Sequence, residues 1–378
     1  MVIFINKKFL LYVPGSSLNE FHKRSPWIQL PIAFNKIGNQ STLICGKFDL
    51  ADFDEFKVYE TIKLNNNLIR SIFEPILAFK IIFKERPRIV MISPIGSYLF
   101  TILPLIFMTK LLLFKKNRPK FLLKSDWNLD YSGLSFVKRT LLNTLFEFSS
   151  RIFDFVTIET YCGVYKAKKL PLVCSDNIVR FPIGFPSNFM SIRKYDNGKR
   201  KKIVLCVARI ARMKDQLTLI KAFGKVSKSI IDWKLILSGP IEDSEYMNEI
   251  NEEIRVLGIS ESIEFTGFLE EKQLLHLYEK ASIFCLPSRF LESAGQVKYE
   301  AIASGIPVIS SDVPCREDNE ELGIMVFNAG DYEDLAKNIK ILMENEELRK
   351  EYSINSQLKL KSYEELVLDL YNNFICKM

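Results

Sequence analysis

The chain has 378 residues, of which 48% are hydrophobic and 26% charged, and it carries a net charge of +7. This composition is typical of a folded globular protein, and the length predicts about two domains. Seven cysteines lie scattered without CxxC spacing, which argues against a zinc site or a disulfide scaffold and indicates the reduced, mostly buried thiols of a cytosolic protein. The two histidines, His22 and His276, lie far apart in the sequence and argue against histidine-based metal or triad chemistry.

The charge is unevenly distributed along the chain. Residues 1–190 hold 26 Lys and Arg against 14 Asp and Glu, a balance of +12, whereas the remaining residues hold 26 against 31, a balance of −5. A basic N-terminal half could face nucleic acid, an anionic membrane surface or a phosphorylated substrate. Because no RNA-binding signature with interleaved exposed aromatic residues is present, we expect no nucleic-acid partner.

Residues 1–190 alternate apolar runs with helical patterns, as βαβ units do. Six predicted strands with intervening helices make one doubly wound, Rossmann-like sheet. The strands are expected at 9–13, 41–45, 88–93, 119–125, 155–159 and 178–181, and the helices at 26–37, 60–83, 95–114 and 134–152.

One apolar segment of this half, residues 95–114, is long enough for a membrane span. It carries a single charge, Lys110, and Pro104 interrupts it. Because strand-like runs lie on both sides, the pattern favours the crossover helix of a parallel sheet, buried or touching a membrane, with a monotopic anchor or a true span as alternatives. The apolar run 9–13 is too short for a signal peptide, and the small residues 14–17 after it predict a turn.

A polar and basic linker is expected at residues 186–202, and a second alternation of strands and helices follows. The sequence therefore predicts a second Rossmann-like domain over residues 191–350, and the helical residues 351–378 are expected to pack back on the first domain, residues 1–190. The second set of strands is expected at 202–207, 233–237, 263–266, 281–286, 307–310 and 324–327, and the helices at 216–228, 246–257, 271–280, 296–304 and 332–344.

The stretch 286–308 combines two carboxylates and a glycine at a strand-to-helix junction. Glu292 is expected in the loop at the carboxyl end of the strand, where open α/β sheets bind ligands, and Glu300 inside the following helix. Gly295 lets the backbone approach a ligand closely. The amides of Gln296 and Val297 are first-turn donors at the positive end of the helix dipole. The sequence therefore predicts an anion site suited to a phosphate.

Further candidate groups follow other predicted strands. Arg209 and Lys214 lie in the loop after the first strand of the second half. A guanidinium fork and a lysine point charge in such a loop can hold a diphosphate, although basic loop residues are more often solvated. In the first half, Asp126 follows the strand 119–125 and is the candidate polar group there, with a helix N-cap or turn residue as the alternative.

Together these motifs form a recognisable set. Its centre is Glu292 and Glu300, separated by seven residues, with Gly295 between them. The second half thereby resembles the donor-binding domain of the retaining, GT-B-fold glycosyltransferases of family 4, over residues 200–345, whereas residues 1–190 resemble it only in architecture. The accompanying residues are Val207-Ala208-Arg209, Lys214, the helix 217–223, Ser238-Gly239-Pro240, Phe265-Thr266-Gly267-Phe268, Pro287-Ser288, Ala301, Ala303, Gly305 and Pro307-Val308.

The resemblance implies a GT-B fold, with a nucleotide-diphosphate sugar in the cleft between two facing domains. It implies that Arg209 and Lys214 neutralise the diphosphate, helped by the backbone amides of residues 295–297. Glu292 would contact the sugar hydroxyls near the reacting centre, and Glu300 would accept from the ribose hydroxyls. Carboxylates suit hydroxyl donors, and cations stabilise the charge of a leaving diphosphate.

The remaining assignments also rest on the resemblance. Gly239, Ser288 and Gly15 are placed among the donor-binding residues, and Asp126 among the catalytic ones. The tripeptide Lys124-Ser125-Asp126 departs from the family, since many members have a histidine there. Neither a metal nor a cofactor is expected, because the cations take the place of a metal.

We therefore expect a hexosyltransferase that moves a hexose from a nucleotide sugar to an acceptor hydroxyl with retention of configuration. The basic half suggests an acceptor such as a lipid-linked or cell-surface glycan, and a cytoplasmic protein that binds the inner face of the membrane peripherally. The alternatives are a nucleotide-sugar binding protein without turnover and a GT-B epimerase acting on the nucleotide sugar itself.

Overall fold

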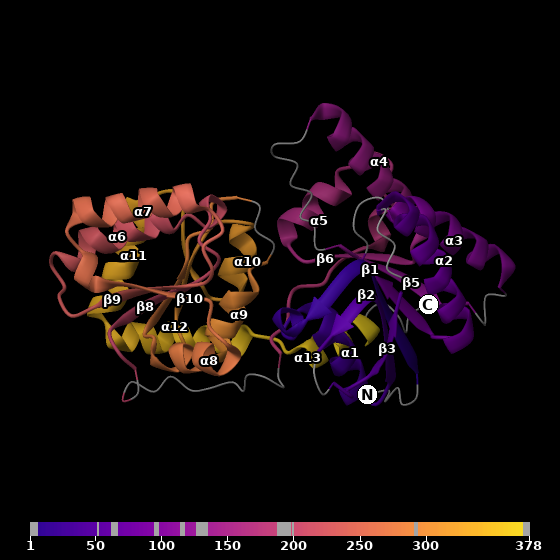
Figure 1. Cartoon of the computed structure of the whole chain (residues 1–378), viewed down its shortest axis with the longest axis horizontal. Coiled ribbons are helices and arrows are strands. Elements are labelled where there is room, and N and C mark those ends of the chain that lie inside the picture. The colour runs from indigo at the N-terminus through magenta and orange to yellow at the C-terminus, as the bar shows by residue number, and fades with distance from the viewer. Residues whose placement is uncertain are drawn as a thin grey trace. The chain divides into compact units, whose positions relative to one another are not determined.

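The computed structural model describes residues 7–50, 53–61, 67–93, 98–113, 118–125, 135–186, 198, 200–290 and 294–372. The chain divides into two compact units (Figure 1). The first comprises residues 1–186 and 361–378, and the second residues 187–360. Each unit is an α/β domain built on one parallel sheet.

In the first unit, seven strands among the described residues form the sheet in the order β3-β2-β1-β4-β5-β6-β7. Every neighbouring pair is parallel, and the central strands are almost wholly buried, as in a sheet covered on both faces. The strands are β1 (Lys8–Asn19), β2 (Gln40–Asp49), β3 (Lys57–Glu60), β4 (Ile89–Ile92), β5 (Lys120–Ser125), β6 (Phe155–Ile158) and β7 (Ile178–Arg180).

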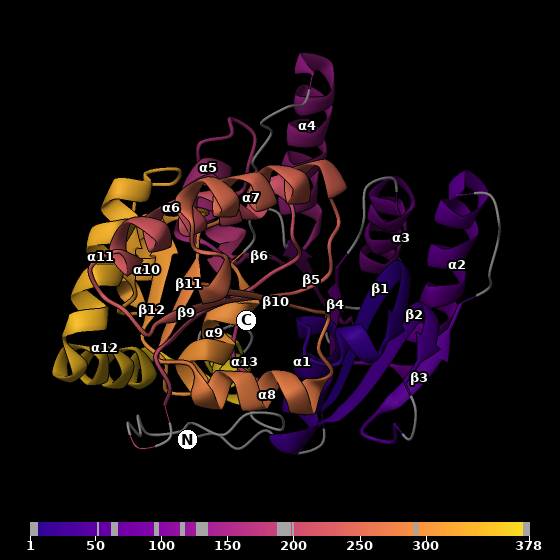
Figure 2. The same cartoon turned by 60° about the vertical axis from the view of Figure 1, so that its left-hand side comes forward.

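Helices cover both faces of this sheet because successive strand side chains point to opposite sides. Leu10 and Tyr12 belong to the core cluster under α2, α3 and α4, whereas the ring of Phe9 stacks on Phe34 of α1 with 3.7 Å between centroids. Figure 2 shows α2, α3 and α4 side by side. The helices are α1 (Pro26–Lys36), α2 (Asn67–Glu85), α3 (Tyr98–Leu112), α4 (Phe136–Ile152), α5 (Tyr161–Lys168) and α13 (Tyr363–Leu370).

Two local predictions for the first unit are wrong. The turn expected at residues 14–17 is instead a bulge within β1, where the pairing with β2 shifts between Val13 and Ser17. The helix expected from residue 60 begins at Asn67, and the polar segment before it forms β3 on the edge of the sheet. Four residues are too few to display a strand alternation, which is why β3 escapes sequence reasoning.

The second unit has six strands among its described residues, in the order β10-β9-β8-β11-β12-β13, the arrangement of a doubly wound nucleotide-binding sheet. They are β8 (Ile203–Val207), β9 (Lys234–Ser238), β10 (Ile263–Gly267), β11 (Ile283–Leu286), β12 (Val308–Ser311) and β13 (Met325–Phe327). The helices are α6 (Gln216–Ser227), α7 (Ser244–Leu257), α8 (Glu271–Lys280), α9 (Gln296–Ala303), α10 (Arg316–Glu321), α11 (Tyr332–Glu344) and α12 (Glu346–Lys359).

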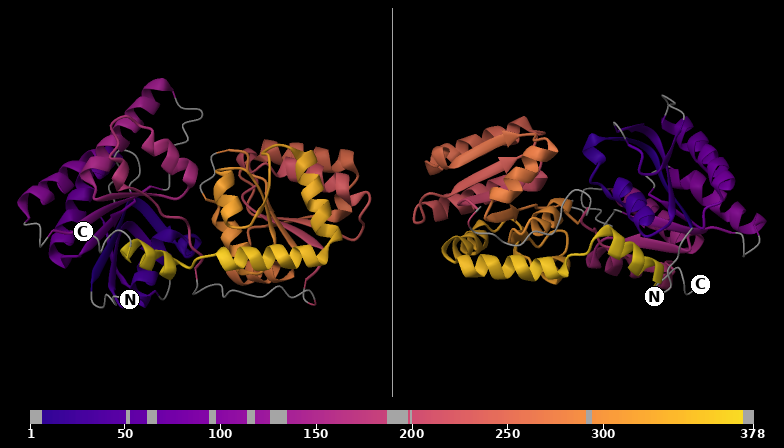
Figure 3. Two further views of the ribbon diagram at one scale, coloured as in Figure 1. Left: turned by 180° about the vertical axis from the view of Figure 1, so that it is seen from behind. Right: turned by 90° about the horizontal axis from the view of Figure 1, so that it is seen from below.

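The C-terminal helices belong to different units. In α12, the Ser353 hydroxyl donates to the Gly305 carbonyl at 2.9 Å, which ties this helix to the second unit. Helix α13 packs on α1 (Figure 3). Lys36 of α1 and Glu364 of α13 form an ion pair of 2.9 Å. The 185–186 end of the first unit adds a main-chain bond, from the Phe185 amide to the Lys361 carbonyl at 3.1 Å.

The apolar segment 95–114 contains α3, which connects the parallel neighbours β4 and β5. It is thus the crossover helix that the sequence predicts. Throughout the described ranges, no helix combines the length and the hydrophobicity that crossing a bilayer would require.

Candidate functional site

The loop after β8, the first strand of the second unit, lies against the loop after β9. The Ala208 amide donates to the Ser238 carbonyl and the Ile210 amide to the Pro240 carbonyl, both at 2.9 Å. A Cβ at Gly239 would lie 2.1 Å from the Ala208 carbonyl oxygen, and φ there is +146°. Only glycine therefore fits at position 239, where it allows the two loops to approach each other.

The two arginines of the β8 loop, Arg209 and Arg212, differ in how firmly an acidic partner binds them. Arg209 forms an ion pair with Glu242, and both side chains are half exposed. Exposed pairs of this kind contribute only about 0–1 kcal/mol, so an incoming anion can compete for the guanidinium. Arg212, by contrast, donates from both Nη atoms to the Glu249 carboxylate of α7, at 2.9 and 2.6 Å.

Lys214 ends a short 3-10 turn, Arg212–Lys214, and is half-buried. Burial raises the pKa of the Cys206 thiol to about 12, and the positive charge of Lys214 opposes this shift. The ammonium group is therefore within electrostatic range of Cys206 near the carboxyl end of β8, the end at which doubly wound sheets bind ligands.

Asp215 follows Lys214 and caps α6 in a left-handed conformation, with φ of +48°. Its buried carboxylate accepts from the Thr218 hydroxyl at 2.8 Å. Burial raises the pKa of this carboxyl, and the Thr218 hydroxyl and the nearby Arg289 oppose the shift. The Arg289 Nη1 lies 3.9 Å from Asp215 Oδ2.

The loop after β11 is joined to the β8 loop by main-chain atoms. The Arg289 amide donates to the Met213 carbonyl at 2.9 Å. Just before it, Ser288 is buried, and its carbonyl accepts from the Ser311 hydroxyl at the end of β12, at 2.6 Å. Ser288 and Arg289 are therefore fixed beside Met213, the residue that precedes Lys214.

Helix α9 begins where the sequence predicts an anion site. Its N-cap, Gly295, has a φ of +72°, which explains the glycine, and a Cβ there would also lie 3.0 Å from Lys298 Cε. Gln296 and Val297 form the first turn, whose amides have no acceptor within a helix. Lys298 is buried, and its Nζ donates to Asn319 Oδ1 at 2.6 Å.

Glu300 lies inside α9 and is only 3% exposed. Its Oε2 accepts from the Tyr278 hydroxyl at 3.1 Å, and its Oε1 accepts from Gln296 Nε2 at 3.2 Å. An ionised carboxylate only accepts hydrogen bonds, and each of its oxygens binds one of these two donors. The surrounding bonds hold the carboxylate in one orientation.

Two predicted catalytic residues, Glu292 and Asp126, lie outside the described residues. The strand before Asp126, β5, carries Lys124, whose Nζ lies 3.1 Å from Glu159 Oε1. Both side chains are buried, with 3% and 5% exposure. A buried ion pair therefore occupies the carboxyl end of β5 and β6, and sequence reasoning missed Glu159 because its partner is 35 residues away.

Gly15, also predicted to bind the donor, has a different environment from the predicted donor-binding residues of the second unit. Its amide donates to the buried Glu74 of α2 at 2.9 Å. The other oxygen of Glu74 accepts from Arg70 Nε at 3.1 Å and from the Tyr98 hydroxyl at 3.2 Å. The Gly15 amide thus already has a carboxylate acceptor.

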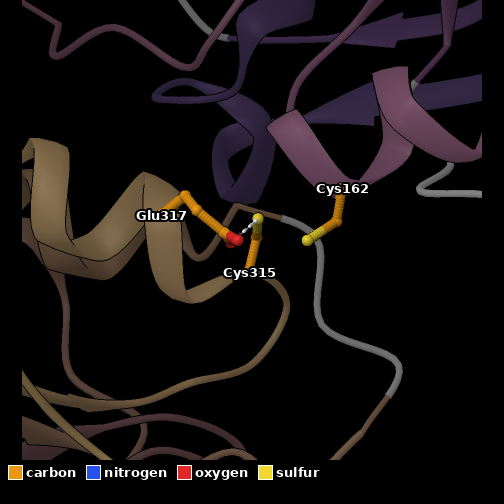
Figure 4. Close-up of side chains that lie close together, drawn as sticks. All are labelled: Cys162, Cys315 and Glu317. Atoms are coloured by element: carbon orange, nitrogen blue, oxygen red, sulfur yellow. Dashed lines mark hydrogen bonds between the residues drawn. The ribbon is translucent and has the colours of Figure 1, made fainter.

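The six cysteines that the structure describes lie outside any disulfide, and four of them are buried. The Cys315 thiol, at the N-terminus of α10, donates to the Glu317 carboxylate at 3.0 Å (Figure 4). This contact could not be predicted from the sequence, and neither could the contacts of Arg289, Asp215 and Lys298. Arg289 could have been suspected, because it is a cation directly after Ser288 in the loop that the motif marks.

Comparison with known proteins supports the assignment of the second unit. Residues 189–359 match the model of the family described as "Glycosyl transferases group 1". The matched residues cover nearly all of the second unit, which spans residues 187–360.

Two characterised relatives illustrate the similarity. Over 114 residues the chain is 32% identical to the alpha-monoglucosyldiacylglycerol synthase of Streptococcus pneumoniae, covering 30% of this chain and 25% of that protein. Over 186 residues it is 27% identical to the GalNAc-alpha-(1->4)-GalNAc-alpha-(1->3)-diNAcBac-PP-undecaprenol alpha-1,4-N-acetyl-D-galactosaminyltransferase of Campylobacter jejuni, covering 47% of this chain and 49% of that protein. The matching segment thus spans a quarter to a half of these relatives.

Solved structures resemble the chain over nearly its whole length. HepE of Anabaena in complex with UDP-glucose superimposes with a TM-score of 0.73, covering 98% of this chain and all of that chain at 14% identity. At this identity the similarity concerns the fold. The chain has the two-domain GT-B fold that the sequence predicts, and its residues 189–359 match the model of the glycosyl transferases group 1 family.

Proposed function

We propose that this protein is a retaining hexosyltransferase, similar to family 4, that transfers a hexose from a nucleotide-diphosphate sugar to an acceptor hydroxyl. One observation carries the proposal: the Arg289 amide to Met213 carbonyl bond, which joins the Lys214 loop to the loop that leads to α9. In this proposal, the cations of the β8 loop and the first-turn amides of α9 bind the same anion at one edge of the sheet. The UDP-glucose complex of the structurally similar HepE supports a nucleotide-sugar donor.

In the proposed reaction, the bond from the anomeric carbon to the diphosphate breaks as the acceptor oxygen bonds to that carbon, and the proton of the acceptor hydroxyl passes to the leaving diphosphate. Negative charge builds up on the diphosphate. Arg209 and Lys214 stabilise it, together with the amides of Gln296 and Val297, and groups fixed in advance stabilise such charge most in the transition state. Because these cations supply the positive charge, the reaction needs neither a metal nor another cofactor.

The carboxylates take the hydroxyl groups of the donor. We assign Glu300 to the ribose, since its buried carboxylate is held in one orientation by Tyr278 and Gln296, and carboxylate oxygens accept from hydroxyl groups. Glu292 is assigned to the sugar hydroxyls near the anomeric carbon, and Asp126 to the acceptor side in the first unit. Ser288 and Gly239 shape the donor loops, whereas Gly15 supports the first unit through Glu74.

The acceptor is proposed to be a lipid-linked or cell-surface glycan, so that the protein works peripherally at the inner face of a membrane. The positive balance of residues 1–190 supports an anionic surface as partner. The Campylobacter relative, whose name includes a PP-undecaprenol acceptor, supports a lipid-linked substrate.

The test is turnover of a panel of nucleotide sugars with and without lipid-linked saccharides, followed by nuclear magnetic resonance of the new linkage. We expect nucleotide diphosphate release, a product with the donor's anomeric configuration, and loss of at least a hundredfold in transfer for Glu292→Gln. The matched control is Glu261→Gln, an exposed acid of the same unit. Isomerised donor would instead identify an epimerase, and donor binding without turnover would identify a binding protein.

A further inference from the structure

The outer face of α2 and α3 in the first unit is apolar. Helix α3 exposes Phe100, Pro104, Phe107 and Leu111, which recur at helical spacing along one side, and the last two are 58% and 69% exposed. Its opposite side, with Ile102, Leu103 and Ile106, is buried in the core. A helix with apolar residues around its whole circumference is normally buried in a protein core or in a membrane.

Helix α2 continues this surface. It packs beside α3 (Figure 2) and exposes Ile69, Ile72, Phe73, Ile76 and Phe83 on the side away from its buried residues. Large exposed apolar patches on soluble proteins mark interaction sites, because leaving them in water is unfavourable. We call these exposed apolar residues of α2 and α3 the α2–α3 face.

A basic pocket adjoins the α2–α3 face. It has a volume of about 620 Å³, and Phe83 belongs both to its lining and to the face. Three guanidinium groups line it, those of Arg86, Arg88 and Arg118, and no carboxylate is among its described lining residues. A guanidinium fork matches the geometry of a phosphate.

Two acids near this pocket are already engaged: Glu85 precedes Arg86 in the sequence, and Asp154 pairs with Lys110, which follows the lining residue Thr109. Glu85 binds Lys57 at 2.7 Å, and the hydrogen bonds from Lys57 and Tyr59 lower the pKa of its carboxyl. Asp154 accepts from the Phe121 amide at 2.8 Å and pairs with Lys110 at 3.0 Å. On α2, the exposed Lys80 and Lys84 add positive charge beside the apolar residues. The pocket and its margin are therefore strongly positive.

We propose that the α2–α3 face and its arginine pocket bind a bilayer of anionic phospholipids, the apolar side chains entering the acyl boundary and the arginines taking lipid phosphates. Charge complementarity selects this occupant, because an anionic bilayer presents apolar chains and phosphates next to each other. The inference rests on the proposed function, since it names the surface that would bring the enzyme to a lipid-linked acceptor.

The test uses the full chain and vesicles that contain neither donor nor acceptor. Flotation with vesicles of 30% phosphatidylglycerol in phosphatidylcholine should recover the protein, and pure phosphatidylcholine should recover far less. Phe107→Ser with Leu111→Ser, and separately Arg86→Ala with Arg118→Ala, should each weaken anionic vesicle binding at least tenfold. The control is Leu358→Ser on α12, which removes an 80% exposed leucine from the second unit.

Circular dichroism and the thermal midpoint of each variant show whether it has folded. Unchanged vesicle binding by both folded double variants would overturn the proposal. A native dimer that becomes monomeric in Phe107→Ser with Leu111→Ser, with vesicle binding intact, would overturn it in favour of a subunit interface. Transfer to a detergent-solubilised acceptor needs no vesicle, so failure of the surface and failure of the proposed activity are separate results.

Discussion

The two units place opposite charges at the same position of the same topology. In each sheet the first strand, β1 or β8, lies between the second and the fourth. After β8 come Arg209 and the half-buried Lys214. After the equivalent point of β1 comes Gly15, whose amide is taken by the buried carboxylate of Glu74.

A doubly wound sheet can bind a ligand at the point where its strand order reverses. The difference between the units shows that the side chains at this point decide whether a ligand can bind there. In the first unit, a carboxylate from α2 accepts from the amide at this position and so closes it with protein groups. In the second, the loop leaves positive charge and helix amides for an anion. The donor diphosphate is accordingly assigned to the second unit.

The largest effect is expected for Glu74→Ala, which removes the buried carboxylate of the first unit. It would leave Arg70 and the Gly15 amide without their carboxylate, and breaking a buried ion pair costs about 3–5 kcal/mol. We expect a loss of that size in the free energy of unfolding, measured with urea. Asp176→Ala, an exposed acid of the same unit, should change it by less than about 0.5 kcal/mol. Equal stability of the native chain and Glu74→Ala would show that this carboxylate does not close the position.

In the second unit, Lys214→Ala should remove stabilisation of the leaving diphosphate. Loss of one such group typically lowers kcat by about 10²–10³-fold, and we expect this for nucleotide diphosphate release under saturating donor. Lys225→Ala on α6, where the exposed lysine pairs only with the surface acid Glu333 among its described contacts, is the matched control. Should Lys214→Ala keep full turnover, the β8 loop is not the diphosphate site.

The smallest expected effect concerns the pH dependence of Asp215. Burial raises its folded-state pKa above the unfolded value of about 3.9. Stability from this group is therefore fully present below that pH and falls as pH rises through the folded pKa. Asp215→Asn keeps an acceptor for Thr218 and removes the titration, so its unfolding free energy relative to the native chain should rise from pH 4 to 7. A constant difference across that range would contradict the assigned shift.

Regular elements followed from the sequence because their signals are local. The helix expected at 26–37 is α1 (Pro26–Lys36), and the one expected at 296–304 is α9 (Gln296–Ala303). In both cases a proline or glycine marks an end and apolar spacing defines the rest. The short helix α5 (Tyr161–Lys168) lacks such a pattern and was not predicted.

The contacts that define the sites could not be predicted in the same way. Glu74 lies within an apolar helix, and nothing near it in the sequence indicates that its partner is the amide of Gly15, 59 residues away. The Arg289 amide to Met213 carbonyl bond likewise joins residues 76 positions apart, and any residue but proline could form it. Long-range partners depend on the register of the whole sheet, which no single motif encodes.

That main-chain bond also bears on how donor preference could diverge. Because its donor and acceptor are backbone atoms, the side chains at 213 and 289 can be exchanged while the two loops stay joined. In the proposed donor site, the anchoring of the diphosphate is thereby separated from the choice of sugar and base. A library of variants at these two positions should yield altered donor preference far more often than loss of the folded loop, and proline at 289 should be the substitution that such a library does not tolerate.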